Sequence, residues 1–193
     1  MEIKEHRKKE IVNAARDLFT NFGYKSVSME QIAMKANVAK GTLYLYFHDK
    51  EDLFYYIARE LIGQMKNFAT KVESKNLLVL DELHEIMYNL LKFRREQKFL
   101  YTIKQEAMNF KTPSACAVER MIDDEIVSYI KRSLERAMDR GIIKKCNTSI
   151  LSFVVIRVYT ALAFEWEEEH EPLNEEEIAE NVKLFLKDGL IIG

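Results

Sequence analysis

Residues 26 to 53 read SVSMEQIAMKANVAKGTLYLYFHDKEDL, and this stretch decides the expected fold. Ser28 and Gln31 form a capping box of the Ser-x-x-Gln type, which predicts that a helix begins here. Asn37 follows a short apolar face and tolerates the left-handed backbone in which a helix often ends. A second short helix is predicted over residues 39–47. Two helices joined by so tight a turn indicate a helix-turn-helix, whose second helix can enter the major groove of DNA.

The chain on either side of this stretch completes a small helical head. An amphipathic helix of about four turns is predicted by apolar residues at three- and four-residue spacing, namely Ile11, Ala14, Ala15, Leu18, Phe19 and Phe22. Gly23 stands where a C-terminal glycine cap belongs. Asp49 begins a further helix, with Glu51 and Asp52 in its first turn, where the helix dipole favours acids.

The outward-facing residues of the second short helix are the candidates for DNA contact. Leu43 and Phe47 face inward at i, i+4 spacing, which leaves the other side chains for the surface. We expect the amino groups to bind phosphates and the glycine to allow close approach of the backbone. We expect the hydroxyls and rings to meet phosphates or base edges. These candidates are Lys40, Gly41, Thr42, Tyr44, Tyr46 and Lys50. The alternative is that any single one of them is an ordinary exposed or core residue.

In order and spacing, the residues of this region resemble a known family. The matching positions are Phe19, Gly23, Tyr24, Ser28, Gln31, Ile32 and Ala33, then VAKGTLY at 38–44, Tyr46, Phe47, Lys50 and Leu53. Over about residues 7–54 they are similar to the N-terminal DNA-binding domain of TetR/AcrR-family transcriptional regulators. The resemblance implies a homodimeric, ligand-responsive regulator, and it implies a phosphate contact for Ser28. It says little about the ligand, because the C-terminal portion of that family is variable.

Length and composition favour an all-α protein. The chain has 193 residues, with only six glycines and two prolines, so long loops are not expected. No alternating β-branched run flanked by turn signals is found, so no sheet is predicted. Beyond the head, helices are predicted over about 77–96, 98–110, 114–140, 148–170 and 174–190. We expect about nine helices, in a three-helix DNA-binding domain over residues 1–48 and a ligand-binding and dimerisation domain over residues 49–193.

Charge distinguishes the predicted head from the rest of the chain. Residues 1–50 carry nine Lys and Arg against six Asp and Glu, a balance of +3, whereas the remaining residues sum to −5. A basic head on an acidic body suits a protein that meets phosphates only through its head. Chance clustering is the alternative explanation.

Other sequence features indicate a cytoplasmic protein. The N-terminus is charged and has no apolar run, so no signal peptide is predicted. Cys116 and Cys146 do not suggest a disulfide framework or a zinc site. The most apolar stretch, residues 150–164, is interrupted by Arg157 and is shorter than the roughly 20 residues that a bilayer span needs. We expect no membrane partner, no metal and no cofactor.

The helices after the head are rich in methionine and aromatic residues, which suit an adaptable apolar cavity. The candidates for such a ligand site are Met65, Phe68, Met87, Phe93, Tyr101, Met108, Phe110, Met121 and Phe153. Each is individually more commonly a core residue. Arg157 is a cation in an otherwise apolar helix, and it either pairs with a buried carboxylate, the more common case, or binds an anionic ligand group. We expect a largely apolar effector with some preference for an anionic group.

The predicted helix from Thr148 is apolar nearly all round and must be covered on several sides. We expect a second subunit to cover one side, because a two-fold DNA site needs a two-fold protein. The family resemblance places the last two long helices at this interface. The expected interface residues are Phe153, Ile156, Phe164, Val182, Phe185 and Leu186. The alternative is burial wholly within one chain.

These features together predict a repressor that binds a palindromic operator as a homodimer and is released by a largely apolar small molecule. A rival interpretation is an all-α di-metal carboxylate enzyme, because Glu167/His170 and Asp81/His84 have the spacing of di-iron bundles. The first pair lies at an acid-rich helix end before Pro172, which is a poor place for a buried metal. A third interpretation is an architectural DNA-binding protein without a ligand cavity.

Overall fold

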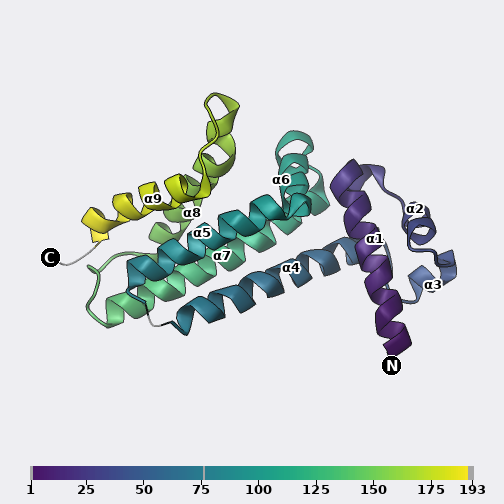
Figure 1. Ribbon diagram of the computed structural model, residues 1–193, viewed down its shortest axis with the longest axis horizontal. Helices are drawn as coiled ribbons and strands as arrows, with labels where there is room; N and C mark the ends of the chain where they lie inside the picture. The colour runs from purple at the N-terminus through teal and green to yellow at the C-terminus, as the bar shows by residue number, and fades with distance from the viewer. Residues whose placement is uncertain (1, 76, 191–193) are drawn as a thin grey trace. The chain divides into compact units, whose positions relative to one another are not determined.

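The computed structural model describes residues 2–75 and 77–190, and within these ranges it contains nine α-helices and no strand. The elements (Figure 1) are α1 Glu2–Ser26, α2 Met29–Lys35, α3 Lys40–Tyr44, α4 Lys50–Glu73, α5 Val79–Glu96, α6 Lys98–Phe110, α7 Pro113–Asp139, α8 Thr148–Thr160, a π-helical turn Ala161–Glu165, a 3₁₀ turn Trp166–Glu168 and α9 Glu175–Leu190. The prediction of an all-α fold with about nine helices is therefore confirmed.

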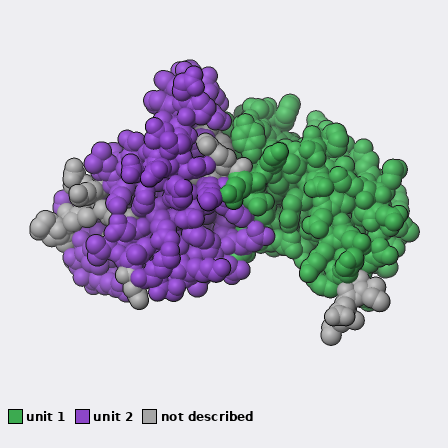
Figure 2. Space-filling model, viewed as in Figure 1, with its two compact units in different colours: residues 1–63, 96–122 green, residues 64–95, 123–193 purple. Residues whose placement is uncertain are grey.

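The chain divides into two compact units (Figure 2). The first unit comprises residues 1–63 and 96–122, and the second comprises residues 64–95 and 123–193. The first unit thus contains the predicted DNA-binding domain together with the start of α4, all of α6 and the start of α7. The compact units do not divide at the expected boundary after residue 48, because α6 packs on α1 and belongs with the head.

The core of the first unit is formed by the apolar faces of α1 and of its neighbours. Ile11, Ala15 and Phe19 are buried, as the spacing of the apolar residues predicted. The predicted glycine cap is also confirmed, because Gly23 has a φ of +76° and interrupts the helical geometry of α1. Phe22 differs from the expectation, since it belongs to the same predicted stripe yet is exposed.

In the second unit, α5 and α7 lie side by side (Figure 1), and α8 and α9 pack against each other. The buried hydroxyl of Tyr159 on α8 donates a hydrogen bond of 2.8 Å to the carbonyl oxygen of Met87 on α5. This hydrogen bond satisfies a buried hydroxyl and fixes the orientation of α8 on α5. The ring of Tyr159 also contributes apolar surface to the core. Met87 is consequently a core residue, although the sequence had suggested it for a ligand cavity.

Some residues of α8 and α9 that were expected at a subunit interface are buried within the chain instead. Ile156, Val182 and Leu186 are buried within the chain itself, so the proposal that they meet a partner subunit needs correction. Phe153 and Phe185 are exposed, at 54% and 66%, and remain available to a partner. The side chain of Phe164 lies outside the described residues.

The apolar segment that begins with α8 is longer than the sequence had suggested. Thr148–Glu168 is helical over 21 residues, which by length and composition alone is enough to cross a membrane. The expectation that this stretch is too short was therefore wrong, because the π and 3₁₀ turns continue the helix. Length and composition are weak grounds for a membrane span, since the core helix of a soluble protein passes the same test.

Candidate functional site

The turn between α2 and α3 is fixed by local hydrogen bonds. The Ser28 hydroxyl accepts from the Gln31 amide at 3.2 Å, and the Ser28 amide donates to the Gln31 side chain at 2.8 Å, which confirms the predicted capping box. Asn37 has a φ of +52°, the left-handed conformation that its sequence position predicted. The Val38 amide then donates to the Ala33 carbonyl at 3.0 Å and closes the turn. These bonds orient α3 rigidly with respect to α2.

Two buried residues anchor α3 and thereby decide which side chains face outward. Leu43 and Phe47 are buried, as predicted. Lys40, Gly41 and Tyr44 are exposed, whereas Thr42 and Tyr46 are partly buried. The structure therefore brings most of the expected DNA-contact residues to one short segment, and their contact with DNA stays a prediction.

Lys40 is held by an acidic neighbour from α2. Its ammonium forms an ion pair with Glu30, and both side chains are more than half exposed. The hydrogen bond raises the pKa of Lys40 and lowers the pKa of Glu30. Both groups are therefore charged at neutral pH, and a phosphate that approaches Lys40 competes with the Glu30 carboxylate.

Leu45 and Met34 are exposed residues of the helix-turn-helix that were not predicted from the sequence. Both are exposed, at 84% and 80%, and they lie directly after α3 and near the end of α2. Leu45 follows Tyr44 immediately, so it adds an exposed apolar side chain to the predicted DNA-binding segment. A pattern that assigns apolar residues to the core could not have found it; only the exposure of the side chain shows it.

Residues 24–28, which follow the break at Gly23 and lead into α2, are called the connector between α1 and α2. A glutamate of α6 holds this connector from its amide side. The Glu106 carboxylate accepts hydrogen bonds from the Tyr24 amide at 2.6 Å and the Lys25 amide at 3.2 Å. Its residue is 7% exposed, so these charge-assisted bonds lie out of bulk water. A Cβ placed on Gly23 would lie 2.9 Å from the same carboxylate. Both the positive φ and this close approach therefore favour glycine at position 23.

The carbonyl side of the same connector is held by Lys50 of α4. The Lys50 ammonium donates to the Tyr24 carbonyl at 2.9 Å and to the Val27 carbonyl at 2.7 Å. Burial lowers the pKa of Lys50, and the charge of Glu106 opposes that effect. The sequence predicted a phosphate donor at this position. The structure instead occupies two of the three ammonium hydrogens within the protein, so Lys50 is first a residue that orients the helix-turn-helix.

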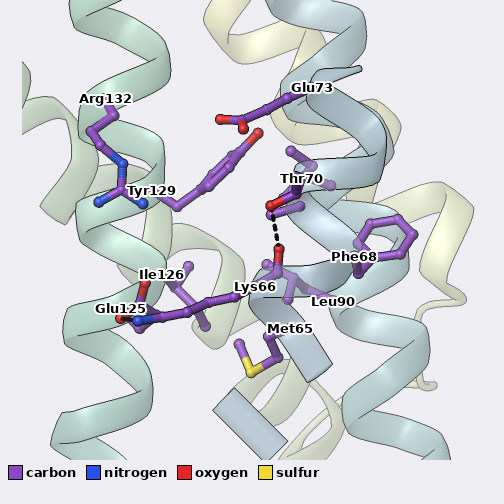
Figure 3. Close-up of a pocket in the computed structure, with 12 residues that line it drawn as sticks. Met65, Lys66, Phe68, Thr70, Glu73, Leu90, Glu125, Ile126, Tyr129 and Arg132 are labelled. Atoms are coloured by element: carbon purple, nitrogen blue, oxygen red, sulfur yellow. Dashed lines mark hydrogen bonds and ion pairs between the residues drawn. The ribbon is translucent and has the colours of Figure 1, made fainter. Parts of the chain in front are cut away.

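A pocket of about 290 Å³ lies in the second unit among α4, α5 and α7 (Figure 3). Met65 and Phe68 line it, as the sequence had suggested for a ligand cavity. Residues that had not been suggested include Ile86, Leu90 and Ile126 on its apolar side, and Thr70, Tyr129 and Arg132 on its polar side. Figure 3 shows Tyr129 and Arg132 projecting from one helix, and Lys66, Thr70 and Glu73 from the helix opposite. The pocket therefore combines an apolar surface with charged groups from two helices.

The other expected ligand residues do not line this pocket. Met87 is a core residue, whereas Tyr101, Met108, Phe110 and Phe153 are exposed. Phe93 and Met121 are partly buried. Methionine and aromatic content thus located only two of the pocket residues, because it does not report which helix faces converge.

Arg157 lies on α8, where the sequence had left two possibilities open. Its guanidinium is 3.3 Å from the Asp123 carboxylate and 5.2 Å from the centroid of the Phe153 ring. The ion pair, which was the more common alternative, is the one that the structure shows. Arg157 does not line the pocket of Figure 3, so it does not support an anionic ligand there.

The predicted metal alternative finds no support in the described part of the chain. Within residues 2–75 and 77–190, no group of three or more His, Cys, Asp and Glu side chains could hold a metal ion. Asp81 instead forms an ion pair of 2.7 Å with Lys183, and the His170 ring stacks on Trp166 at 4.0 Å. These contacts give Asp81 and His170 other structural roles.

Comparison with known proteins agrees with the helix-turn-helix geometry. Residues 11–57 match the model of the family described as bacterial regulatory proteins, tetR family. An uncharacterised HTH-type transcriptional regulator of Bacillus subtilis, YhgD, is 37% identical over 184 residues, which cover 95% of this chain and 96% of the relative. A fatty acid metabolism regulator protein of Bacillus subtilis is 38% identical over 85 residues, 42% of this chain and 44% of that relative.

Solved structures share the fold over nearly the full length. A complex of SmeT with triclosan has a TM-score of 0.80 at 14% identity, covering 97% of this chain and 92% of SmeT. The fatty acid degradation regulator FadR from Bacillus halodurans has a TM-score of 0.75 at 19% identity, covering 93% and 94%. The fold and the head thus define a helix-turn-helix transcriptional regulator. This chain belongs to the TetR family, because residues 11–57 match the family model and the match to YhgD covers nearly the whole length of both chains.

Proposed function

We propose that this protein is a homodimeric repressor that binds a two-fold symmetric operator and is released by a largely apolar small molecule. The observation that carries the proposal is the segment from Lys40 to Tyr46, which the capping box and the buried Leu43 and Phe47 hold in an outward-facing position. In this proposal the α3 helices of two subunits enter successive major grooves, about 34–36 Å apart.

We assign the DNA contacts by the chemistry of each side chain. Lys40 and the helix start at Ser28 position the protein on phosphates, and Lys50 contributes through the connector that it holds. Gly41, Thr42, Tyr44 and Tyr46 approach the base edges, and Leu45 adds an apolar surface that suits a thymine methyl group.

The proposed subunit interface uses the outer faces of α8 and α9. Ile150 and Phe153 on α8, and Leu184 and Phe185 on α9, are exposed apolar side chains that one subunit leaves uncovered. Exposed large apolar side chains on two helices that pack together are typical of a subunit contact. This interface replaces the buried residues that the sequence had suggested with exposed ones, and it retains Phe153 and Phe185.

The pocket among α4, α5 and α7 is the proposed effector site. Its apolar side is formed by residues such as Met65, Phe68 and Leu90. The names of two relatives, a fatty acid metabolism regulator and a complex with triclosan, support an effector with a large apolar part. To release the operator almost completely, the effector must bind the DNA-incompetent state more tightly by roughly 5 kcal/mol.

The proposal can be tested by selecting operator DNA from a random duplex library with the purified protein. We expect the selected sequences to be palindromic and the complex to contain an even number of subunits. A Lys40→Ala, Thr42→Ala, Tyr44→Ala triple variant should remain folded and lose the selected site. A cellular reporter driven by that site should be silenced by the protein; increased transcription would instead indicate an activator. Equal operator binding by a folded triple variant would refute the assignment of α3.

A further inference from the structure

Four charged side chains line the pocket of the second unit, and three of them have an oppositely charged partner. Lys66 Nζ lies 3.0 Å from Glu125 Oε2, and both residues line the pocket. Glu73 Oε1 lies 3.1 Å from Arg136 Nη1. Among the described residues, Arg132 has no carboxylate oxygen within 4.0 Å of its guanidinium nitrogens. Of the four charged residues that line the pocket, Arg132 is therefore the one that forms no ion pair within the described part of the chain.

The uncharged polar groups of the pocket already donate to protein atoms. The Tyr129 hydroxyl donates to Glu82 Oε1 at 3.1 Å, and burial raises the pKa of this tyrosine, so it remains protonated. The Thr70 hydroxyl donates to the Lys66 carbonyl at 3.0 Å, as the dashed line in Figure 3 shows. The Arg132 guanidinium, with its centre 5.9 Å from the Tyr129 ring centroid, has five N–H donors in a planar arrangement.

The rest of the lining sets the size and polarity of the occupant. Met65, Phe68, Ala69, Ile86, Leu90 and Ile126 form an apolar surface. The volume of about 290 Å³ is at the lower end of the range of roughly 300–1,000 Å³ for small-molecule sites. An occupant of this pocket has a short apolar body and one charged end.

We propose that the effector is a medium-chain acyl or single-ring aryl carboxylate, whose carboxylate pairs with Arg132 and whose apolar end lies against Met65, Phe68 and Leu90. This inference rests on the proposed function, in which the pocket is the effector site. The planar guanidinium matches a carboxylate with two parallel hydrogen bonds, and the same charge repels a cationic ligand of equal length. Arg132 thus takes the role that the sequence had suggested for Arg157.

The test compares three probes of equal chain length on the full-length protein bound to its selected operator. Decanoate, decanol and decyltrimethylammonium are titrated below their micelle-forming concentrations, and DNA release is followed by fluorescence anisotropy. We expect decanoate to act at a concentration about tenfold or more below that of decanol, and the ammonium probe to be the weakest. 3-Phenylpropionate should release the DNA as well and represents the aryl class.

Two variants isolate the role of the charge. Arg132→Met should make decanoate and decanol equally effective, while leaving operator affinity unchanged. Arg157→Met is the matched control, because it removes an arginine whose carboxylate partner is Asp123, and it should retain the preference for decanoate. A preference that survives in Arg132→Met, or that disappears in Arg157→Met, would overturn the assignment of Arg132.

A third variant separates this inference from the function on which it rests. Ala69→Phe places a ring in the pocket and should abolish the response to decanoate and decanol alike. If both probes release wild-type DNA equally and Ala69→Phe blocks both, the effector pocket stands and the carboxylate inference fails. If Ala69→Phe still responds like wild type, the pocket is not the effector site. Failure of decanoate and 3-phenylpropionate alike to bind the wild type in a thermal-shift assay also overturns the inference.

Discussion

At Gly41, our proposal makes the size of the side chain matter to DNA binding and not to the fold. A Cβ at this position would meet no heavy atom within 4 Å, so the protein itself has room for alanine. Because glycine loses more entropy in a helix, Gly41→Ala should raise the free energy of unfolding by roughly 0.5–1 kcal/mol. The added methyl group should meanwhile weaken operator binding, because in our proposal the backbone of α3 approaches the base edges at this position.

The two effects can be separated with a matched glycine. Gly63 is also helical and also has no heavy atom within 4 Å of an added Cβ, but it lies in α4. Gly63→Ala should give a similar gain of stability in urea unfolding and leave operator affinity unchanged in anisotropy titrations. Undiminished DNA binding by Gly41→Ala would show that the backbone of α3 does not approach the groove closely.

Asp49 makes part of the stability of the head depend on pH. Its carboxylate accepts from the Asp52 amide at 2.8 Å, and this backbone hydrogen bond, assisted by His48, lowers the pKa of Asp49 below its ordinary value of 3.8. A lowered folded-state pKa gives stability that is present above the unfolded value and is lost as the pH falls through the folded value. Asp49→Asn keeps a capping oxygen but removes the charge, so it should lower stability somewhat at pH 7 and reduce the loss between pH 4 and 2. Urea unfolding of both proteins across this range measures the difference; identical pH dependence would contradict the assignment.

At the scale of elements, α6 stabilises the helix-turn-helix through one carboxylate. Glu106 serves two amides of the α1–α2 connector, and its neighbour Lys104 forms an ion pair of 3.0 Å with Glu119 of α7. Glu106→Ala leaves the Tyr24 and Lys25 amides without their acceptor, which should cost about 1–3 kcal/mol. We expect these two amides to exchange their hydrogens faster.

The control for Glu106 is a glutamate whose ion pair is exposed. Glu30→Ala removes the partner of Lys40, and exposed pairs of this kind contribute roughly 0–1 kcal/mol. A stability loss in Glu106→Ala no larger than that in Glu30→Ala, together with unchanged amide exchange at Tyr24 and Lys25, would show that the connector does not depend on α6.

The helices α8 and α9 present one face to their own chain and, in our proposal, the other to a second subunit. Phe153→Glu combined with Phe185→Glu places charge on the exposed face and should yield a folded monomer in sedimentation velocity. Val182→Glu instead buries an unpaired charge within the chain and should unfold the second unit. Phe110→Glu, which changes an exposed phenylalanine of α6, should leave the dimer intact. A wild-type protein that sediments as a monomer at micromolar concentration would rule out the interface.

At the scale of the whole molecule, DNA and effector must affect each other equally if both bind the same protein. Thermodynamic linkage requires that the factor by which a saturating effector weakens operator binding equals the factor by which saturating operator weakens effector binding. We expect this factor to be the same in operator titrations by anisotropy and in effector titrations by calorimetry. Unequal factors would mean that the effector competes for DNA in some other way, for example through a second site.

Several features of the fold depend on residues that lie only a few positions apart, and these could be predicted from the amino-acid sequence. Ser28 and Gln31 fixed the start of α2, Asn37 fixed its exit, and Gly23 fixed the break in α1. The bounds of α6 were also predicted, since it spans the expected residues 98–110, whereas α3 ends at Tyr44 and not at the expected residue 47. Capping bonds, left-handed turns and helical periodicity are short-range effects, so short stretches of sequence contain the information needed to predict them.

Contacts between residues far apart in the chain could not be predicted from any short stretch of sequence. Glu106 reaches an amide 82 positions away, and Lys50 donates to a carbonyl 26 positions away. Periodicity placed Val182 and Phe185 on one apolar stripe, yet the first is buried within the chain and the second is exposed. The physical reason is that periodicity reports which residues share a helix face, whereas burial depends on how the helices pack. Helix packing likewise gives the two arginines different surroundings: Arg157 pairs with Asp123, whereas Arg132 lines the pocket.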